Sequence, residues 1–425
     1  MAKFIVEKAG PLHGEVVISG AKNAVLPILA ATVLTDEICT IYDVPRLRDV
    51  DVMCRILRSL GKTVEEDYGN HTVIVSGSVN TSTIPYELVK KMRASFFVMG
   101  PLVAKTGAAN IAQPGGCSIG SRPIDLHIKG LRKLGAKVVI EESLVDASAQ
   151  QLTGDLVYLD FPSVGATENI MMAAALAKGT SIIENAAEEP EIVDLANFLN
   201  KMGAKIKGAG TDSIRIEGVE SLHGTKHTVI PDRIETGTFM VAAAISRGNV
   251  LVRNCVSDHV RPVIAKLIEC GASVSEEGDG IRVNAEGMHL KATSVKTMPY
   301  PGFPTDMQAP FMALLTTVEG TSTVNETVFE NRFMHADELS RMGANIRVDG
   351  RTATVPGDKR PLTGAKVVST DLRGGAALVL AGLVAEGTTE VGEIYHIERG
   401  YERFKEKLNQ LGAKVIRVED PQNDQ

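Results

Sequence analysis

The sequence predicts an α/β protein built from six repeated units of about 70 residues, three in each of two lobes. One observation is a short phrase, an apolar residue followed by Gly and then Ala or Lys, that recurs six times. Its glycines stand 68 to 74 residues apart, a spacing hard to explain by chance. They are Gly61, Gly135, Gly203, Gly271, Gly343 and Gly412. Each glycine lies between a helical pattern and a Val/Ile alternation, so we expect it to end a helix in the left-handed conformation and to precede a strand.

A second phrase precedes each glycine phrase: a helix of small apolar residues, then a turn and a β-rich run. Its copies are Ala24–Thr35, Ala94–Thr106, Asn169–Lys178, Thr238–Arg247, Ala309–Glu319 and Ala376–Glu386. Five copies close on a glycine, whereas the first closes on Thr35-Asp36. Each unit is therefore predicted to be helix, strand, helix and strand pair, a piece too small to be stable alone.

The lobes are predicted to separate near Pro231, after the third unit. This gives one lobe at residues 22–229 and a second at residues 1–21 plus 230–425. The sixth unit has few strands of its own, and Phe4–Glu7 and Glu15–Ser19 have strand character, so we expect them to complete the second lobe. The two chain crossings near residues 21 and 230 are predicted to act as a hinge, and the tail from Glu419 to be disordered.

Composition limits the partners and the compartment. The net charge is −7 without a basic tract, which argues against nucleic acid. The N-terminus has no apolar run of signal-peptide length, and the longest apolar runs are far shorter than a membrane span. Five cysteines without a CxxC pair indicate reduced thiols. We expect a cytoplasmic protein without a membrane or nucleic-acid partner, and a homo-oligomer is compatible with the sequence.

The loop from Gln113 to Pro123 places one thiol in an unusual setting. Cys117 lies between Gly115-Gly116 and Gly120, close to Arg122 and to a helical pattern that starts at Pro123. A nearby cation and a helix N-terminus both favour the thiolate and lower the pKa of a cysteine. A glycine-rich turn with an incidental small apolar residue is the ordinary alternative, and the loop alone slightly favours it.

Charged or amide residues recur at the start of each small-residue helix. They are Lys22-Asn23, Arg93, Gly165–Glu168, Arg233–Glu235, Asp306 and Asp371–Arg373. If the units wrap together, helix N-termini with free N–H groups face a common cleft and attract anions. Ordinary capping would explain Asp306 and Thr167. It does not explain cations at Lys22, Arg93 and Arg233, which oppose the helix dipole.

The available groups suit proton transfer on an anionic substrate. The chain has no dinucleotide or P-loop signature, no His/Asp/Glu cluster with metal-ligand spacing, and no local serine-nucleophile motif. What remains is a thiol, carboxylates and several arginines, which supports acid–base chemistry without a metal or cofactor.

Ten segments along the whole chain match a known family. They are Ser19–Asn23, Met92–Ser95, Pro114–Gly120, Arg122–His127, Ser163–Thr167, Pro231–Gly237, Phe303–Gln308, Glu330–His335, Thr370–Arg373 and His396–Tyr401. On these residues the chain resembles the UDP-N-acetylglucosamine 1-carboxyvinyltransferases of the enolpyruvyl transferase family. The resemblance implies two inside-out α/β barrel lobes closing over a cleft, and addition of the sugar 3′-hydroxyl to phosphoenolpyruvate followed by loss of phosphate.

The resemblance also implies roles for individual residues. Cys117 matches the cysteine that donates a proton to the methylene carbon or helps to release product, and that can hold phosphoenolpyruvate as a covalent adduct. Asp306 matches the proposed base. Lys22, Arg122 and Arg399 match the cations around phosphoenolpyruvate, so Cys117, Asp306, Lys22 and Arg399 are predicted to be catalytic. Asp371 and Arg373 match residues tied to closure and turnover, and Arg332 matches another cleft arginine. Positions matching the UDP-sugar site are Asn23, Arg93, Arg122, Pro123, Ile124, Asp125, Leu126, Ser163, Val164 and Val328, to which we add Gly165.

One position departs from the family pattern. Some members carry a lysine where this chain has Phe161, so one contact to the uridine diphosphate is expected to be absent or supplied differently. We therefore expect Ser163, Val164 and Gly165, in preference to Phe161 and Pro162, to contact the UDP-sugar. Asp306 is expected to become a competent base only in the closed, occupied cleft.

Two further expectations concern the thiols and the alternatives. Cys117 is expected to be the one cysteine alkylated by a small anionic epoxide such as fosfomycin, with Cys39, Cys54, Cys255 and Cys270 in the core. The alternatives are a 3-phosphoshikimate 1-carboxyvinyltransferase, an idle UDP-sugar-binding paralogue and, more weakly, a scaffold. The Cys117 loop argues against the first, and the intact set of predicted catalytic residues argues against the second.

Overall fold

The computed structural model describes residues 2–113, 124–141, 144–357 and 361–419, without the side chains of Lys91 and Arg93. Two compact units divide these residues. The N-unit consists of the described residues between Gly20 and Ile230, and the C-unit of those up to Ser19 and from Pro231 onward. The chain therefore passes between the units at Ser19–Gly20 and again at Ile230–Pro231. The hinge expected there stays a prediction.

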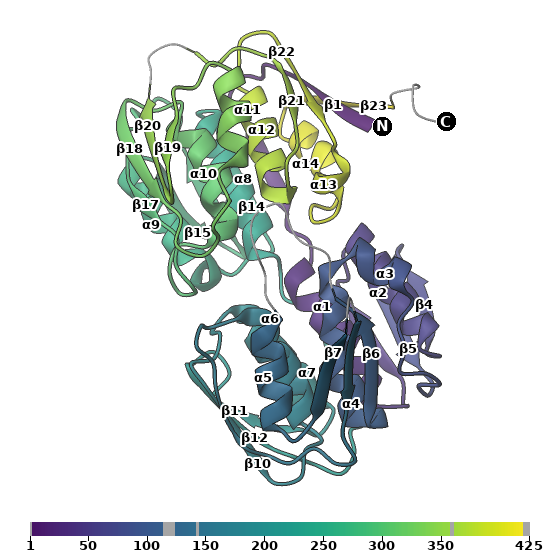
Figure 1. Cartoon of the computed structure of the whole chain (residues 1–425). Helices are drawn as coiled ribbons and strands as arrows, with labels where there is room; N and C mark the ends of the chain where they lie inside the picture. Colours follow the sequence, from purple (N-terminus) through teal and green to yellow (C-terminus); the bar gives the residue numbers. More distant parts are fainter. Residues whose placement is uncertain (1, 114–123, 142–143, 358–360, 420–425) are drawn as a thin grey trace. The chain divides into compact units, whose positions relative to one another are not determined.

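The N-unit alternates helices with short strands (Figure 1). Its helices are α1 Lys22–Ala31, η1 Thr32–Leu34, α2 Arg48–Ser59, α3 Tyr86–Lys91, η2 Arg93–Val98, α4 Met99–Thr106, α5 Asp125–Lys133, α6 Val164–Ala174 and α7 Pro190–Lys201. Its strands are β3 Cys39–Tyr42, β4 Thr63–Asp67, β5 Thr72–Ser76, β6 Ala108–Ala112, β7 Lys137–Glu141, β8 Leu144–Ser148, β9 Leu156–Tyr158, β10 Thr180–Glu184, β11 Lys205–Lys207, β12 Ser213–Glu217 and β13 Lys226–Thr228.

The C-unit has the same alternation and includes the first two strands of the chain (Figure 1). Its helices are α8 Arg233–Ile245, η3 Ser257–Val260, α9 Arg261–Cys270, η4 Thr305–Met307, α10 Gln308–Leu315, α11 Met334–Arg341, α12 Leu372–Gly382, α13 Tyr395–Glu398 and α14 Phe404–Gln410. Its strands are β1 Ala2–Glu7, β2 His13–Val17, β14 Asn249–Arg253, β15 Ser273–Glu277, β16 Gly280–Asn284, β17 Val295–Lys296, β18 Gly320–Asn325, β19 Arg347–Asp349, β20 Thr352–Gly357, β21 Lys366–Val368, β22 Thr388–Gly392 and β23 Lys414–Glu419.

The five four-stranded sheets among the described residues share one strand order, whereas the sheet β6-β8-β7 has no parallel edge strand. In β9-β10-β12-β11, β2-β14-β16-β15 and β17-β18-β20-β19, the strand after the small-residue helix has a parallel edge neighbour and an antiparallel inner neighbour. In the last sheet β1 takes the inner place, with Phe4 opposite Val391 and Arg417. The first strands of the chain therefore complete two sheets of the C-unit: β1 joins β21, β22 and β23, and β2 joins β14, β15 and β16.

Buried helices form the middle of each unit. In the C-unit α8, α10 and α12 pack against one another, and in the N-unit α6 packs against α1 and α4. Close approach depends on small residues: a Cβ on Gly100 of α4 would lie 2.2 Å from the carbonyl oxygen of Asn169 in α6. The sheets lie outside these helices, and their strands alternate buried with exposed side chains, as in β12 and β8.

The six phrase glycines behave as predicted. Each follows a helix, namely α2, α5, α7, α9, α11 or α14, and each has a φ between 91° and 107°. Such φ values place a Cβ in steric conflict, so glycine is the favoured residue there.

The first repeat differs from the others at Lys62, which stands where the other copies have alanine. Its ammonium group is buried and donates hydrogen bonds to the carbonyl oxygens of Thr35 and Gly77. Burial lowers the pKa of Lys62, whereas Asp36 raises it. Lys62 thus links the residue after η1, Thr35, to the residue after β5, Gly77.

The described cysteines sit in different surroundings. Cys39, Cys54 and Cys270 are buried, as expected, but Cys255 is only half-buried, so the prediction that it belongs to the core was too strong. Burial raises the pKa of Cys54 to about 12 and that of Cys255 to about 11, which disfavours the reactive thiolate. Cys117 lies outside the described residues.

Two kinds of feature are absent from the described residues: membrane-spanning helices and metal-binding clusters. None of their helices combines the length and hydropathy needed to cross a membrane. Their His, Cys, Asp and Glu side chains form no group of three that could bind a metal ion.

Candidate active site

Asp306 lies between two buried arginines in the C-unit. Arg332 Nη2 is 2.7 Å from Asp306 Oδ1, and Arg373 Nη2 and Nε are 3.2 and 3.3 Å from Oδ2. The arginine side chains are 4% and 2% exposed, whereas that of Asp306 is 27% exposed. Two guanidinium groups favour the ionised carboxylate. One carboxylate cannot neutralise both, so this three-residue cluster keeps one net positive charge.

Aromatic rings and polar groups hold the two arginines. The Arg332 guanidinium lies 5.1 Å from the ring centre of Phe329, and that of Arg373 lies 5.1 Å from the ring centre of Tyr401. Tyr401 is itself fixed, since its hydroxyl is 2.9 Å from the Thr238 hydroxyl on α8. Arg373 Nη1 is buried without a hydrogen-bond partner among the described residues. A donor of this kind is available to an anionic ligand.

Asp371 caps the helix that carries Arg373. Its Oδ1 accepts hydrogen bonds from the backbone N–H groups of Arg373 at 2.9 Å and Gly374 at 3.1 Å. Asp306 has a different position: it lies inside the 3-10 turn η4, which is followed by α10, and caps neither. The capping interpretation of Asp306 is therefore wrong. Its carboxylate is bonded to the side chains of arginines instead of to the first N–H groups of a helix.

Thr167 does not cap its helix either. Ser163 is the cap of α6, with its hydroxyl 3.4 Å from the Ala166 nitrogen, and Thr167 lies one turn further on. The Thr167 hydroxyl donates to the Ser163 carbonyl at 2.8 Å and accepts from the Ala187 N–H at 3.1 Å. Its polar group thus joins α6 to the segment before α7.

His335 and Arg399 add charge-sensitive groups to the C-unit. His335 is buried beside Arg332 and Asp371; burial lowers its pKa to about 4, Asp371 opposes that shift, and Arg332 adds to it. The ring is therefore neutral near pH 7. Arg399 follows α13 and is half-buried. Burial first, and then the charge of Arg399, lower the pKa of the neighbouring His396.

Lys22 starts α1 in the N-unit and is paired with a carboxylate. Its Nζ is 3.3 Å from Oδ2 of Asp49, in the first turn of α2, and both side chains are largely buried. A cation at a helix N-terminus is disfavoured by the helix dipole, and the ion pair with Asp49 offsets this effect for Lys22. Arg233, which starts α8, has its guanidinium 5.7 Å from the ring centre of Tyr300. Asn23 follows Lys22 and is half-buried.

The first turns of α5 and α6 come together in the N-unit. A Cβ on Gly165 would lie 3.3 Å from Cε1 of His127, so the two helices approach closely here. The Asn169 amide donates to His127 Nδ1 and to the Phe96 carbonyl oxygen, each at 3.0 Å. This contact places Ser163, Val164 and Gly165 next to the helix that starts at Asp125. Two groups of predicted sugar-binding residues are thereby brought close to each other.

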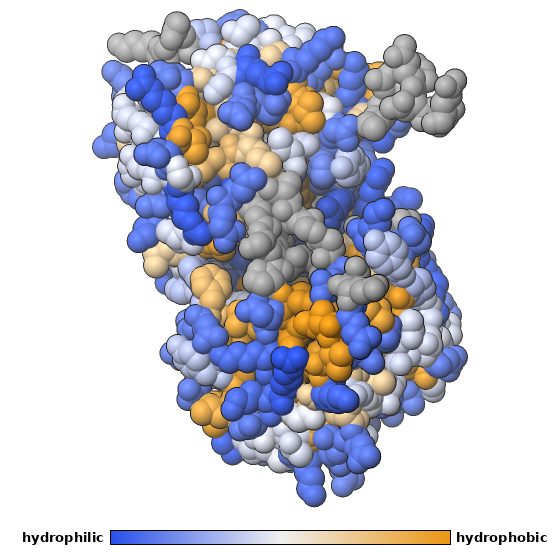
Figure 2. Space-filling view, in the orientation of Figure 1, coloured by the Kyte–Doolittle hydropathy of each residue, from blue (hydrophilic) through white to orange (hydrophobic). Residues whose placement is uncertain are grey.

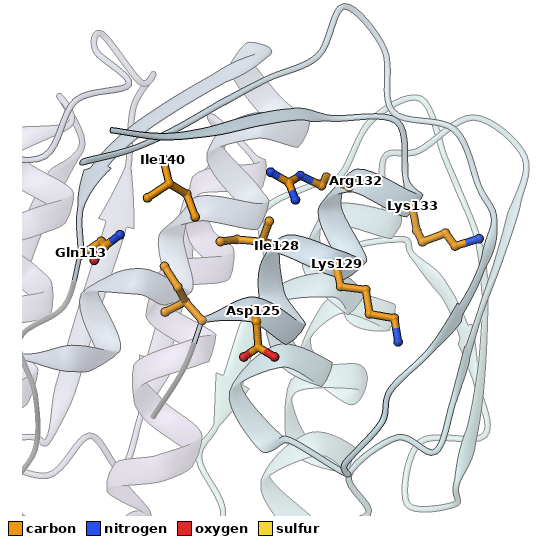
Figure 3. Close-up of a pocket in the computed structure, with 8 residues that line it drawn as sticks. Gln113, Asp125, Ile128, Lys129, Arg132, Lys133 and Ile140 are labelled. Atoms are coloured by element: carbon orange, nitrogen blue, oxygen red, sulfur yellow. The ribbon is translucent and has the colours of Figure 1, made fainter. Parts of the chain in front are cut away.

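A pocket opens beside α5. It has a volume of about 650 Å³ and is lined by Gln113, Ile124, Asp125, Ile128, Lys129, Arg132, Lys133 and Ile140. Figure 3 shows the α5 side chains along one side and Ile140 of β7 across from Ile128. Figure 2 shows hydrophobic surface on this face of the N-unit. Ile124 and Asp125 are the predicted site residues that line the pocket; Leu126 is half-buried nearby.

Val328 lies after β18, and its N–H donates to Glu326 Oε1 at 2.9 Å. Phe161 is exposed. Cys117, Arg122 and Pro123 lie outside the described residues, as does the side chain of Arg93.

Glu168 on α6 is a buried carboxyl group outside the predicted set. It has no exposed surface, and neither oxygen has a hydrogen-bond partner among the described residues. Burial and then the charges of Glu191 and Glu189 raise the pKa of Glu168 well above its ordinary value. The folded protein therefore keeps a proton on Glu168 at pH values where the unfolded chain has lost it.

Replacing Glu168 by glutamine is expected to make the stability less dependent on pH. In the unfolded chain Glu168 ionises near its ordinary pKa, so between that pKa and the raised one the folded state holds one extra proton. The wild-type free energy of unfolding then falls as pH rises, and Glu168→Gln removes this fall. We expect the stability of the variant relative to wild type to increase as the pH rises from 5 to 8. Urea denaturation at several pH values measures the free energy of unfolding, with Glu184→Gln at an exposed position as the control. A stability difference between Glu168→Gln and wild type that does not change with pH would contradict the expectation.

Comparison with known proteins places the chain among characterised relatives. A family model described as EPSP synthase (3-phosphoshikimate 1-carboxyvinyltransferase) matches residues 6–408. UDP-N-acetylglucosamine 1-carboxyvinyltransferase 1 of Caldanaerobacter subterraneus subsp. tengcongensis is 61% identical, over 98% of this chain and 99% of the relative. The protein named UDP-N-acetylglucosamine 1-carboxyvinyltransferase 2 in Carboxydothermus hydrogenoformans is 60% identical, over 99% and 100%. The chain belongs to the UDP-N-acetylglucosamine 1-carboxyvinyltransferase family.

Solved structures extend the relationship to the fold. The enolpyruvyl transferase NikO from Streptomyces tendae superposes with a TM-score of 0.89 at 26% identity, over 99% of each chain. EPSP synthase from Acinetobacter baumannii gives a TM-score of 0.76 at 19% identity, over 99% of this chain and 100% of its own, and so speaks to the fold alone. The predicted family, a transferase, and the enolpyruvyl transferase fold are confirmed.

Within this carboxyvinyltransferase, sequence reasoning located some site residues and missed others. It singled out Asp306, Arg332 and Arg373, which the fold brings into one cluster. It missed Asp49, Thr305 and Glu326, which hold predicted residues in place. Thr305 adjoins Asp306 in the motif Phe303–Gln308 and could have been suspected. Asp49 gave no local signal, because Lys22 is 27 residues away, and neither did the link from Glu326 to Thr305, which spans 21 residues.

Proposed function

We propose that this chain transfers the enolpyruvyl group of phosphoenolpyruvate to the 3′-hydroxyl of UDP-N-acetylglucosamine and releases phosphate, the first committed step of peptidoglycan precursor synthesis. The observation that carries this function is identity of 54–61% with relatives of that name over nearly the full length of both chains. The cationic surroundings of Asp306 suit a substrate pair that carries several phosphates and a carboxylate.

In the proposed reaction the sugar oxygen bonds to C2 of phosphoenolpyruvate as Asp306 takes the hydroxyl proton and Cys117 supplies a proton to C3. Loss of a C3 proton and of phosphate then restores the double bond. Lys22, Arg122 and Arg399 bind the phosphate and carboxylate. Asn23, Arg93, Arg122 to Leu126, Ser163 to Gly165 and Val328 hold the UDP-sugar, and Arg332, Asp371 and Arg373 belong to the same cleft. The half-buried cap of α6 and the α5 start beside it support the placement of the sugar site.

The proposed architecture has six repeats, three in each of two inside-out barrel lobes that close over the cleft. The common strand order of the sheets and the buried helices in each unit support it. Asp306 becomes an effective base only in the closed, occupied cleft. The reaction runs in the cytoplasm without a cofactor, and phosphoenolpyruvate can form an adduct on Cys117, the one thiol open to fosfomycin.

Release of inorganic phosphate tests this function. Wild-type protein with phosphoenolpyruvate and UDP-N-acetylglucosamine is expected to release phosphate, whereas shikimate 3-phosphate as acceptor should release none. Cys117→Ser should release phosphate about 100-fold more slowly, because serine is a much weaker acid than a thiol. Binding of the UDP-sugar without phosphate release would instead identify an idle paralogue.

A further inference from the structure

Glu326 is a buried carboxylate just after β18 that accepts four hydrogen bonds. It is 1% exposed. Its Oε1 accepts from Thr297 Oγ1 at 2.9 Å and from the N–H groups of Val328 at 2.9 Å and Phe329 at 3.1 Å. Its Oε2 accepts from Thr305 Oγ1 at 2.9 Å. A buried carboxylate persists only when its lone pairs meet donors, and this one meets four.

The ionised state of Glu326 sets the direction of the Thr305 hydroxyl group. An ionised carboxylate only accepts hydrogen bonds, so the Thr305 hydrogen points at Glu326. A lone pair of the same oxygen is then available to Arg332, whose Nη1 donates to it at 2.8 Å. The other Arg332 nitrogen, Nη2, lies on Asp306 Oδ1 at 2.7 Å. An ordered chain of contacts thus runs from Glu326 through Thr305 and Arg332 to Asp306.

Glu326 also holds the surface on which Arg332 rests. The N–H of Phe329 is bonded to Glu326, and the ring of Phe329 lies 5.1 Å from the Arg332 guanidinium. The guanidinium is therefore fixed along its edge by Thr305 and against its face by Phe329. The Glu326 carboxylate also accepts a hydrogen bond from the backbone N–H of Val328, a predicted contact of the UDP-sugar.

We propose that Glu326 is a positioning residue for the transfer reaction, acting through Thr305 and Arg332 to hold the Asp306 carboxylate in the orientation that accepts the hydroxyl proton. This role rests on the proposed function. Glu326 has no contact with Asp306 itself, so it acts only through the residues between them.

Other charged or titratable groups lie near Asp306, Arg332 and Arg373, and they also affect how activity depends on pH. Arg373 contacts Asp306 from α12, and Asp371 and His335 lie beside Arg332. Tyr401 and Asp232 act on Arg373 from its other side. None of these groups contacts the Thr305 hydroxyl, so a substitution at Thr305 changes the Arg332 side of Asp306 alone.

Thr305→Val and Thr305→Ser test the inference as a matched pair. Valine removes the hydroxyl at constant shape, and serine keeps it. We expect Thr305→Val to lower kcat for phosphate release about 10- to 100-fold, because small misplacements of a reacting group have effects of this size. The acid limb of its kcat profile should move to higher pH, since a loosened Arg332 stabilises the Asp306 carboxylate less. Thr305→Ser should stay within about threefold of wild type.

Two further variants make the test decisive. Glu326→Gln keeps the volume but puts an amide donor against either Thr305 or the backbone N–H groups, so it should lower kcat and raise KM for UDP-N-acetylglucosamine. Glu326→Gln tests the same proposal if the Thr305→Val variant does not fold. Thr321→Val, on the exposed start of β18, should match wild type.

The outcomes distinguish the positioning role of Glu326 from the proposed function. A wild-type kcat and pH profile in Thr305→Val, or an equal loss of kcat in Thr305→Ser, would overturn the positioning role. Wild-type protein that released no phosphate would overturn the proposed function instead.

Discussion

Asp306→Asn should lower kcat for phosphate release about a thousandfold while leaving the binding of UDP-N-acetylglucosamine within a few fold of wild type. A positioned general base contributes roughly 10²- to 10⁴-fold to a rate, and asparagine cannot take the hydroxyl proton. The amide has nearly the shape of the carboxylate, and its oxygen can still accept from Arg332 Nη2, which lies 2.7 Å from Asp306 Oδ1. Chemistry should therefore suffer far more than folding.

The measurement is phosphate release with both substrates saturating, together with calorimetric titration of the UDP-sugar. Asp337→Asn is the matched control, because it is the same substitution at an exposed position of α11. Near-normal turnover in Asp306→Asn would remove Asp306 from the role of base. Loss of sugar binding equal to the loss of turnover would make it a binding residue only.

Arg373→Lys should lower kcat/KM about 100-fold although the positive charge is kept. Arg373 places two guanidinium nitrogens on Asp306 Oδ2 and stacks its planar group near the Tyr401 ring. A lysine ammonium is a point donor that cannot reproduce the fork or the stacking. The substitution also removes the buried Nη1 of Arg373, which has no hydrogen-bond partner among the described residues.

Thermal unfolding separates this kinetic effect from loss of structure. Arg373 is 2% exposed, so we expect the lysine variant to lose about 1–3 kcal/mol of stability as well. Arg347→Lys, exposed on β19, is the control and should match wild type in both assays. An Arg373→Lys variant with normal kcat/KM would show that charge alone suffices at this position.

Six helix ends could be read from the sequence because their signal is local. A left-handed residue after a helix favours glycine wherever the helix lies, so Gly61 and its five counterparts each marked the end of a helix. Strand character at Phe4–Glu7 likewise survives in β1, since alternation of buried and exposed side chains depends on the strand itself. The family motifs added the site residues, most of which no periodicity distinguishes.

The N-cap of α6 was predicted wrongly because more than one residue in the segment Ser163–Thr167 has a side chain that can cap a helix. Ser163 caps α6 although Thr167 has an equally suitable hydroxyl, and the deciding factor is where the helix begins. Cys255 was assigned to the core from its apolar neighbours, but it follows the end of β14 and keeps part of its surface exposed. Burial depends on what packs from elsewhere in the chain.

The amino-acid order by itself determined the recurring glycine phrase, the C-terminal ends of six helices and the family, because each depends on neighbouring residues or on long matched motifs. Only the tertiary structure decided which groups pair: Lys22 with Asp49, Asp306 with Arg332 and Arg373, and Glu326 with Thr305. These partners are 21 to 67 residues apart in the chain. Charge pairing is a property of distance in space, and that distance is set by how the buried helices and their sheets pack.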